Sequence, residues 1–326
     1  MRFSNVVLAA AAGTAVNAQR PESEPICDYY VKALLKNNTA ENQATLLTLL
    51  VNTVVIGNST ADTMPNVGVK VPGILAPGEI DGKQVNLAPY FDGSLASSNT
   101  GGKSGSSVNF LDGGGAEPLK NNKPANDNTS KQYFLLTHLY QYFGSLLGCS
   151  MQGMSGFDVY GGHGSMYEVH KFMDLGKPEM DYFIAQVGLA AASFGVAKDD
   201  VTAVAKSLNT AFNMACSPPA TIIKAQGEQL QAICIDQSSC PKAEKAQCDK
   251  YAAVVKPSNA TSMPSGSSMM PTGTSMPTGS SMSSATDMPT STSMPSGSAS
   301  SVPSNAAAAG GYSFAAAAAG IAAFLL

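Results

Sequence analysis

Apolar side chains recur with the period of an α-helix in two separate parts of this chain. The first part is residues 19–57, where the spacing predicts two consecutive helices that belong to a globular domain. Their apolar stripes are Tyr30, Ala33 and Leu34 in the first helix, and Leu46, Leu47, Leu50, Val51 and Val54 in the second.

The second part, residues 131–216, has a longer helical pattern and is expected to form the core of the domain. Its first stripe stops at Gly148, a residue typical of helix ends. A short helix is expected at 166–172, and two further helices should open near Pro178 and near Asp199. The first stripe consists of Leu135, Leu136, Leu139, Phe143, Leu146 and Leu147.

Residues 58–130 lack any sustained period, because proline, glycine, asparagine and serine interrupt every apolar run. We interpret this segment as a long irregular insertion with at most fragments of strand. Residues 217–256 contain the last three cysteines, and we expect one or two short helices there. The predicted fold class is therefore all-α.

Both ends of the chain carry patterns typical of secretion and surface attachment. Residues 1–18 combine a basic start, an apolar run and small residues before Gln19, as a signal peptide does. Residues 257–305 are rich in Ser, Thr, Pro and Met, which predicts an O-glycosylated stalk. Residues 306–326 end in a short apolar tail without a following charge, which predicts a removed GPI signal with Asn305 as the lipid-bearing residue.

The composition limits the kinds of molecule that the protein is expected to bind. The net charge is −4 and no cluster of Lys or Arg occurs, so nucleic acid is not an expected partner. The lipid would place the domain on the extracellular face of the plasma membrane or in the cell wall, with cell-wall glycans as possible neighbours. Signal, stalk and anchor together resemble cell-wall proteins of fungi.

In an oxidising compartment, cysteines are expected to form disulfides and some asparagines to carry N-glycans. The 6 cysteines predict three disulfides, with the pairing left open by the sequence. They are Cys27, Cys149, Cys216, Cys234, Cys240 and Cys248. Acceptor patterns for N-glycans begin at Asn37, Asn58, Asn128 and Asn259, and we expect some of them to be used.

Residues able to carry chemistry are few. The chain has 3 histidines, and it lacks the short motifs of serine hydrolases, zinc proteases and phosphate-binding loops. His163 is expected in a loop, and no ligand role is expected for His163 or His138. His170 lies four residues after Met166, so both share one face of a short helix, and a neutral imidazole there is a reasonable iron ligand.

Four short motifs in order resemble the group I truncated haemoglobins, best over residues 133–214. The stretches are Tyr142–Gly148 (YFGSLLG), Tyr160–Gly162 (YGG) and Met166–His170 (MYEVH), followed by two long helices. Near the N-terminus, Asp28–Leu34 (DYYVKAL) is similar to the pattern that precedes the ligand side of the haem in that family.

The resemblance implies a globin-like fold that binds haem b. It places His170 beneath the iron as the proximal metal ligand and Tyr30 above it as a hydrogen-bond donor. It also implies that Leu135 and Leu139 form the distal wall. The expected activity is an interaction with O₂, NO, peroxide or haem itself, and whether this amounts to an enzyme is left open. The alternative is a cell-wall or adhesion glycoprotein without a cofactor.

Overall fold

The computed structural model describes residues 20–58 and 68–260, all within one compact unit. This part contains 41% helix and 11% strand, and its strands form two small antiparallel sheets. The fold is therefore mixed α/β, and the all-α prediction is wrong. The sheets come mainly from residues 58–130, whose sequence pattern predicts an irregular segment.

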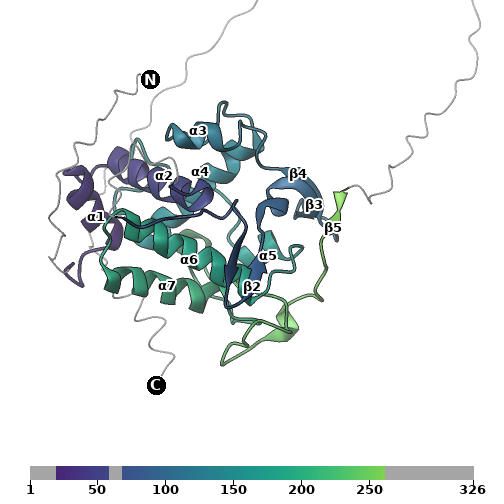
Figure 1. The fold of residues 1–326 in the computed structure, drawn as a ribbon. Coiled ribbons are helices and arrows are strands. Elements are labelled where there is room, and N and C mark those ends of the chain that lie inside the picture. Colours follow the sequence, from purple (N-terminus) through teal and green to yellow (C-terminus); the bar gives the residue numbers. More distant parts are fainter. Residues whose placement is uncertain (1–19, 59–67, 261–326) are drawn as a thin grey trace, which may run out of the picture. The chain divides into compact units, whose positions relative to one another are not determined.

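The helices agree closely with the apolar periodicity (Figure 1). Both predicted N-terminal helices form, and so do the long helices of the core. Their bounds are α1 Ile26–Leu35, α2 Ala40–Ile56, α3 Ala116–Lys120, α4 Lys131–Leu147, α5 Met166–His170, α6 Lys177–Ser193 and α7 Lys198–Phe212.

Local side-chain bonds define where several helices begin and end. At α4, the Ser130 hydroxyl accepts a hydrogen bond from the Tyr133 amide at 3.1 Å, and Gly148 ends the helix with φ 74°. The predicted stop at Gly148 is confirmed. At α7 no side chain caps the first turn, and Asp200 within that turn bonds to Tyr30 and Arg20.

The strands are short, and one of them pairs with a strand far away in the sequence. Strands β1 and β2 form one hairpin, and the second sheet has the order β4-β3-β5. In this sheet Ser258 and Asn259, at the end of the described chain, pair with Ala96 and Leu95. The bounds are β1 Gly78–Ile80, β2 Lys83–Val85, β3 Asp92–Ser98, β4 Ser106–Asn109 and β5 Ser258–Asn259.

Helix α2 is central to the packing, because it contacts both α4 and α6, while α6 packs against α7 (Figure 1). Leu47 of α2 and Leu208 of α7 are almost completely buried, as expected for apolar positions that face a shared core. Strand β4 contacts α4 and strand β3 contacts α5. The inserted sheet thus lies against both helices that the resemblance assigns to a haem site.

Three disulfides are present, as the even cysteine count predicted. Cys27 of α1 joins Cys149 just beyond α4, Cys216 joins Cys248, and Cys234 joins Cys240. The first bond links the N-terminal helices to the core across 122 positions.

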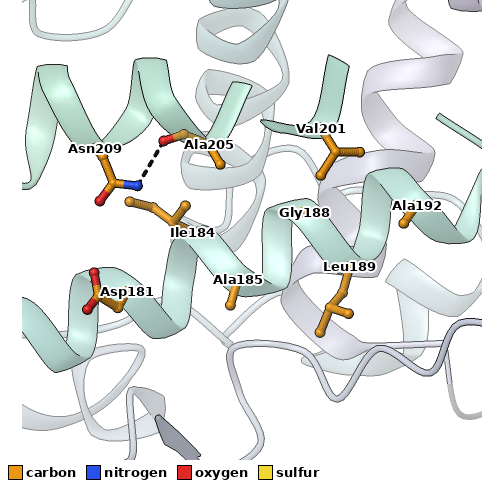
Figure 2. Close-up of a pocket in the computed structure, with 9 residues that line it drawn as sticks. All are labelled: Asp181, Ile184, Ala185, Gly188, Leu189, Ala192, Val201, Ala205 and Asn209. Atoms are coloured by element: carbon orange, nitrogen blue, oxygen red, sulfur yellow. Dashed lines mark hydrogen bonds between the residues drawn. The ribbon is translucent and has the colours of Figure 1, made fainter. Parts of the chain in front are cut away.

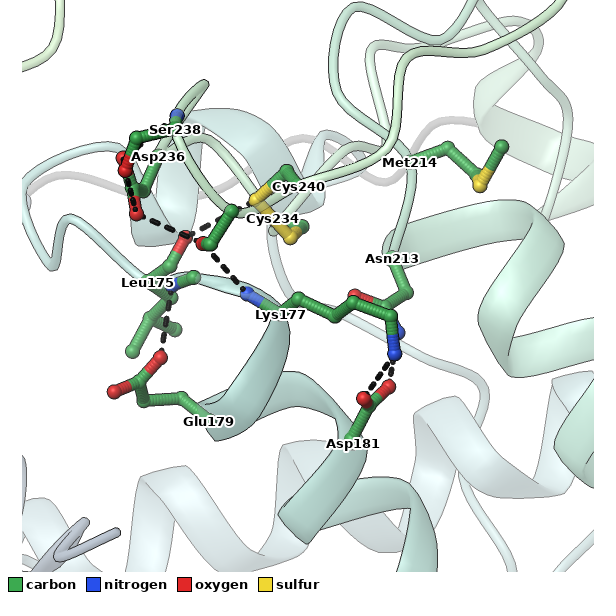
Figure 3. The surroundings of a disulfide bond; sticks show 12 residues. Leu175, Lys177, Glu179, Asp181, Asn213, Met214, Cys234, Asp236, Ser238 and Cys240 are labelled. Carbon is green, nitrogen blue, oxygen red and sulfur yellow. Dashed lines mark hydrogen bonds and ion pairs between the residues drawn. A yellow bond between two sulfur atoms is a disulfide. The ribbon is translucent and has the colours of Figure 1, made fainter. Parts of the chain in front are cut away.

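The segment 217–256 is held against the core mainly by backbone bonds and disulfides. It contains only short 3₁₀ turns, at Lys224–Gln226 and Cys248–Lys250, so the helices expected there do not form. Figure 3 shows the Cys234–Cys240 bond close to Lys177 at the start of α6. The Ser239 hydroxyl accepts from the Lys177 amide at 3.1 Å. The segment therefore secures the first turn of α6.

Candidate functional site

His170 is the last residue of α5, a short helix capped by Ser165, whose hydroxyl accepts from the Glu168 amide at 3.2 Å. The Nδ1 atom of His170 lies 2.7 Å from the carbonyl oxygen of Met166. Because a carbonyl oxygen only accepts, Nδ1 must carry the proton of the neutral ring. The lone pair of the imidazole is then on Nε2, the atom that would bind a metal.

The environment of Nε2 leaves that lone pair open. Within residues 20–58 and 68–260, His170 forms no other hydrogen bond, and Nε2 is not among the buried polar atoms that lack a partner. Burial lowers the pKa of His170 from 6.5, which favours the neutral ring that can bind a metal.

A metal site made only of protein ligands is not formed by the described residues. No group of three or more His, Cys, Asp or Glu side chains comes together in this part of the chain. Haem needs fewer protein ligands than a bare metal ion, because the macrocycle supplies four nitrogen ligands and the protein adds an axial one. His170 offers such a donor, but a macrocycle also needs a cavity beside the imidazole, and neither cavity found among the described residues is lined by His170.

Tyr30 does not fit the expected role above the iron. Its hydroxyl donates to Oδ2 of Asp200 at 2.8 Å and accepts from the Ala197 amide at 2.9 Å. Arg20 binds the same carboxylate through Nη2 at 2.8 Å. Burial raises the pKa of Tyr30 to about 12. The hydroxyl is fully used in a joint between α1 and α7, since both of its hydrogen-bonding directions are taken.

Leu135 and Leu139 are partly buried on α4, and Leu139 packs against the core. They share a helix face with Tyr142, because the three residues are spaced i, i+4 and i+7. The Tyr142 side chain is 6% exposed, and its hydroxyl has no hydrogen-bond partner among the described residues.

The other two histidines have simpler surroundings. His138 of α4 lies edge-on to the ring of Tyr160 at 5.9 Å, and burial lowers its pKa. His163 lies in the loop before α5, as expected, where Nδ1 accepts from the Ser165 amide at 3.1 Å. Its Nδ1 is therefore occupied, as is Nδ1 of His170.

Two cavities found among the described residues are not lined by His170. The larger is an open groove of about 520 Å³ between α6 and α7, with Asp181 and Asn209 at one end and Val201 and Ala192 at the other (Figure 2). The smaller, of about 20 Å³, lies beside Tyr167. Neither cavity is lined by any of the residues Tyr30, Leu135, Leu139 or His170.

The predicted glycan acceptors differ in accessibility. Asn37, Asn128 and Asn259 are exposed. Asn58 is 8% exposed, and its side chain bonds to the Val69 carbonyl at 2.7 Å and to the Val71 amide at 2.9 Å. A glycan on its Nδ2 would have to fit beside an almost buried side chain whose Nδ2 donates to the Val69 carbonyl.

The predicted signal peptide, the stalk beyond Ala260 and the lipid site Asn305 lie outside the described residues. Within the ranges that are described, no helix is long and apolar enough to cross a bilayer. A scan against protein-family models and searches of curated proteins and of solved structures found no match for this chain.

Proposed function

We propose that this chain is a secreted, GPI-anchored surface protein whose domain binds haem b through Nε2 of His170. The observation that supports this most directly is the state of the imidazole. Its proton is directed to the Met166 carbonyl at 2.7 Å, while Nε2 forms no hydrogen bond within the described part of the domain.

Each residue would contribute a defined property. Nε2 of His170 would donate its lone pair to the iron, and the Met166 carbonyl would hold the ring in its orientation and tautomer. Leu135 and Leu139 would offer apolar contact to the macrocycle. The bound haem itself would supply the iron chemistry towards O₂, NO or peroxide.

The proposed extracellular location limits which haem activities are feasible. A domain outside the cell has no access to cytosolic reductants, so haem capture, sensing or peroxide chemistry is a better match than turnover driven by NADH. The lipid would hold the protein at the outer leaflet. The O-glycosylated stalk would separate the domain from the membrane, near cell-wall glycans.

A second candidate is a cell-wall or adhesion glycoprotein without a cofactor. Two observations favour it. The hydroxyl of Tyr30 is bonded to Asp200, and the sheet formed by the insertion contacts both α4 and α5. In this alternative the inserted sheet takes the place between those helices that a cofactor would need.

A haemin titration separates the two candidates. The secreted full chain, the His170→Ala variant and a His163→Asn control are mixed with haemin, and absorption spectra are recorded. Asn can still accept from the Ser165 amide, so the control preserves the loop before α5. The haem proposal expects a sharp Soret band in the wild type and the control, its loss in His170→Ala, and recovery with added imidazole. An unchanged band in His170→Ala, or no band in the wild type, contradicts it.

A further inference from the structure

One face of α4 combines an exposed aromatic ring with polar side chains. Phe134 is 50% exposed, and His138 and Gln141 follow it at i+4 and i+7, so the three residues share this face of the helix. They extend over about 10 Å along the helix axis. Neither cavity found among the described residues is lined by any of them, so the face is an open surface.

The connection that follows α4 lies along the same face. The Gln152 side-chain amide donates to the carbonyl oxygens of Gln141 at 2.8 Å and of Asp158 at 3.2 Å, which holds the connection against the helix. Further along, the Tyr160 ring meets the His138 ring edge-on, with the ring centroids 5.9 Å apart. We call the surface formed by the following residues the α4 platform: Phe134, His138, Gln141, Asp158, Val159 and Tyr160.

The side chains of the α4 platform mix exposed apolar surface with unused polar groups. Val159 is 64% exposed and Asp158 is exposed beside it. Nε2 of Gln141, the ring nitrogens of His138 and the carboxylate of Asp158 form no hydrogen bond within residues 20–58 and 68–260. Burial lowers the pKa of His138, so its ring is neutral at physiological pH and has both a donor and an acceptor.

This mixture matches a sugar ring better than a protein or a bilayer. A pyranose with equatorial hydroxyls has apolar C–H faces that stack on an aromatic ring, and a polar rim that bonds to planar side chains such as Gln141. A protein partner would have to desolvate the same polar groups and match each of them. A bilayer surface attracts clusters of Lys and Arg, whereas α4 has a single such residue, Lys131.

We propose that the α4 platform binds a chain of β-linked glucose, with the Phe134 ring against one face of a sugar and with Gln141 and His138 bonded to its hydroxyls. Glucose is preferred because all of its ring hydroxyls are equatorial, whereas mannose has an axial hydroxyl that obstructs one face. The inference rests on the proposed extracellular location near cell-wall glycans, and it does not depend on haem binding.

The test is a calorimetric titration of the secreted full chain with laminarihexaose, a linear oligosaccharide of β-linked glucose. Phe134→Tyr keeps the aromatic face and should bind as the wild type does. Phe134→Leu keeps apolar surface without the ring and should bind about tenfold more weakly. Gln141→Met removes the amide and should bind about three- to fivefold more weakly. The control Val255→Ala truncates an exposed side chain outside the platform and should leave the affinity unchanged.

The melting temperature of Phe134→Leu should match that of the wild type, because the Phe134 ring is half exposed. The inference is overturned if the wild type does not bind laminarihexaose, if Phe134→Leu binds it equally well, or if mannohexaose binds with the same affinity. Sedimentation equilibrium tests the alternative of a second copy: a wild-type dimer that dissociates in Phe134→Leu would make the platform a protein interface and would also overturn the inference. All titrations are made without haemin, so their failure is distinct from the absence of a Soret band.

Discussion

The disulfide between Cys27 and Cys149 should contribute more stability than that between Cys234 and Cys240. Both pairs are buried, with exposed fractions of 1% and 8% in the first and 0% and 6% in the second. Replacing either pair by alanine therefore removes a similar amount of buried sulfur. The two bonds differ mainly in the length of chain that they close, which is 122 positions against 6.

The magnitude follows from the entropy of the unfolded chain. Closing a loop of 122 positions lowers that entropy enough to stabilise the fold by about 5 kcal/mol, whereas a loop of 6 positions contributes about 2 kcal/mol. The double variant Cys27→Ala/Cys149→Ala should thus lose about 3 kcal/mol more free energy of unfolding than Cys234→Ala/Cys240→Ala.

Urea unfolding followed by far-ultraviolet circular dichroism measures this difference. With a denaturant slope of about 3 kcal/mol/M, the midpoint should fall by about 1.6 M for the long loop and by about 0.7 M for the short one. If the Cys234–Cys240 variant lost as much stability as the other, loop entropy would not account for the stabilisation. In that case native contacts around the first turn of α6 would determine the ranking.

Three further outcomes are expected. Tyr30→Phe should lower the free energy of unfolding by about 1–3 kcal/mol in urea melts, because it breaks the bond to Asp200. It should leave haemin affinity unchanged. Weaker haemin binding would restore Tyr30 as a ligand contact. The pKa of His170 is depressed on folding, so the unfolded chain binds its proton first and stability should fall as pH drops below about 6.5. Thermal melts of His170→Gln between about pH 7.5 and about pH 5 should show a shallower fall than the wild type; parallel curves would contradict the shift. Glycopeptide mass spectrometry of the secreted protein should find Asn58 without a glycan, and a glycan there would refute its buried role. Asn58→Gln should lower the free energy of unfolding by about 1–3 kcal/mol, because it disrupts the bonds to Val69 and Val71. The control Asn128→Gln should change it by less than about 0.5 kcal/mol.

The long helices could be predicted because their signal is local. Each of α2, α4, α6 and α7 repeats apolar residues over at least four turns, and Gly148 marks the end of α4 through its own backbone conformation. The position of His170 four residues after Met166 was also local, and the bond between its ring and that carbonyl follows from helical geometry.

The sheets could not be predicted in the same way. Their strands are 2 to 7 residues long and contain Gly, Ser and Asn, so no alternation distinguishes them from loops. Strand β5 exists only because Ser258 and Asn259 meet β3, and that pairing joins positions more than 160 residues apart. Hydrogen bonds between strands depend on which segments become neighbours, and this is a property of the whole fold.

The candidate site shows the same division between local and tertiary information. The sequence by itself determined the positions of the main helices, the presence of three disulfides and the single histidine on α5. Only the tertiary structure decided that Cys27 pairs with Cys149, that Tyr30 bonds to Asp200 and that the hydroxyl of Tyr142 is left unpaired among the described residues. Helical periodicity shows which face of a segment is apolar, but hydrogen-bond partners are set by residues that come together only when the chain has packed.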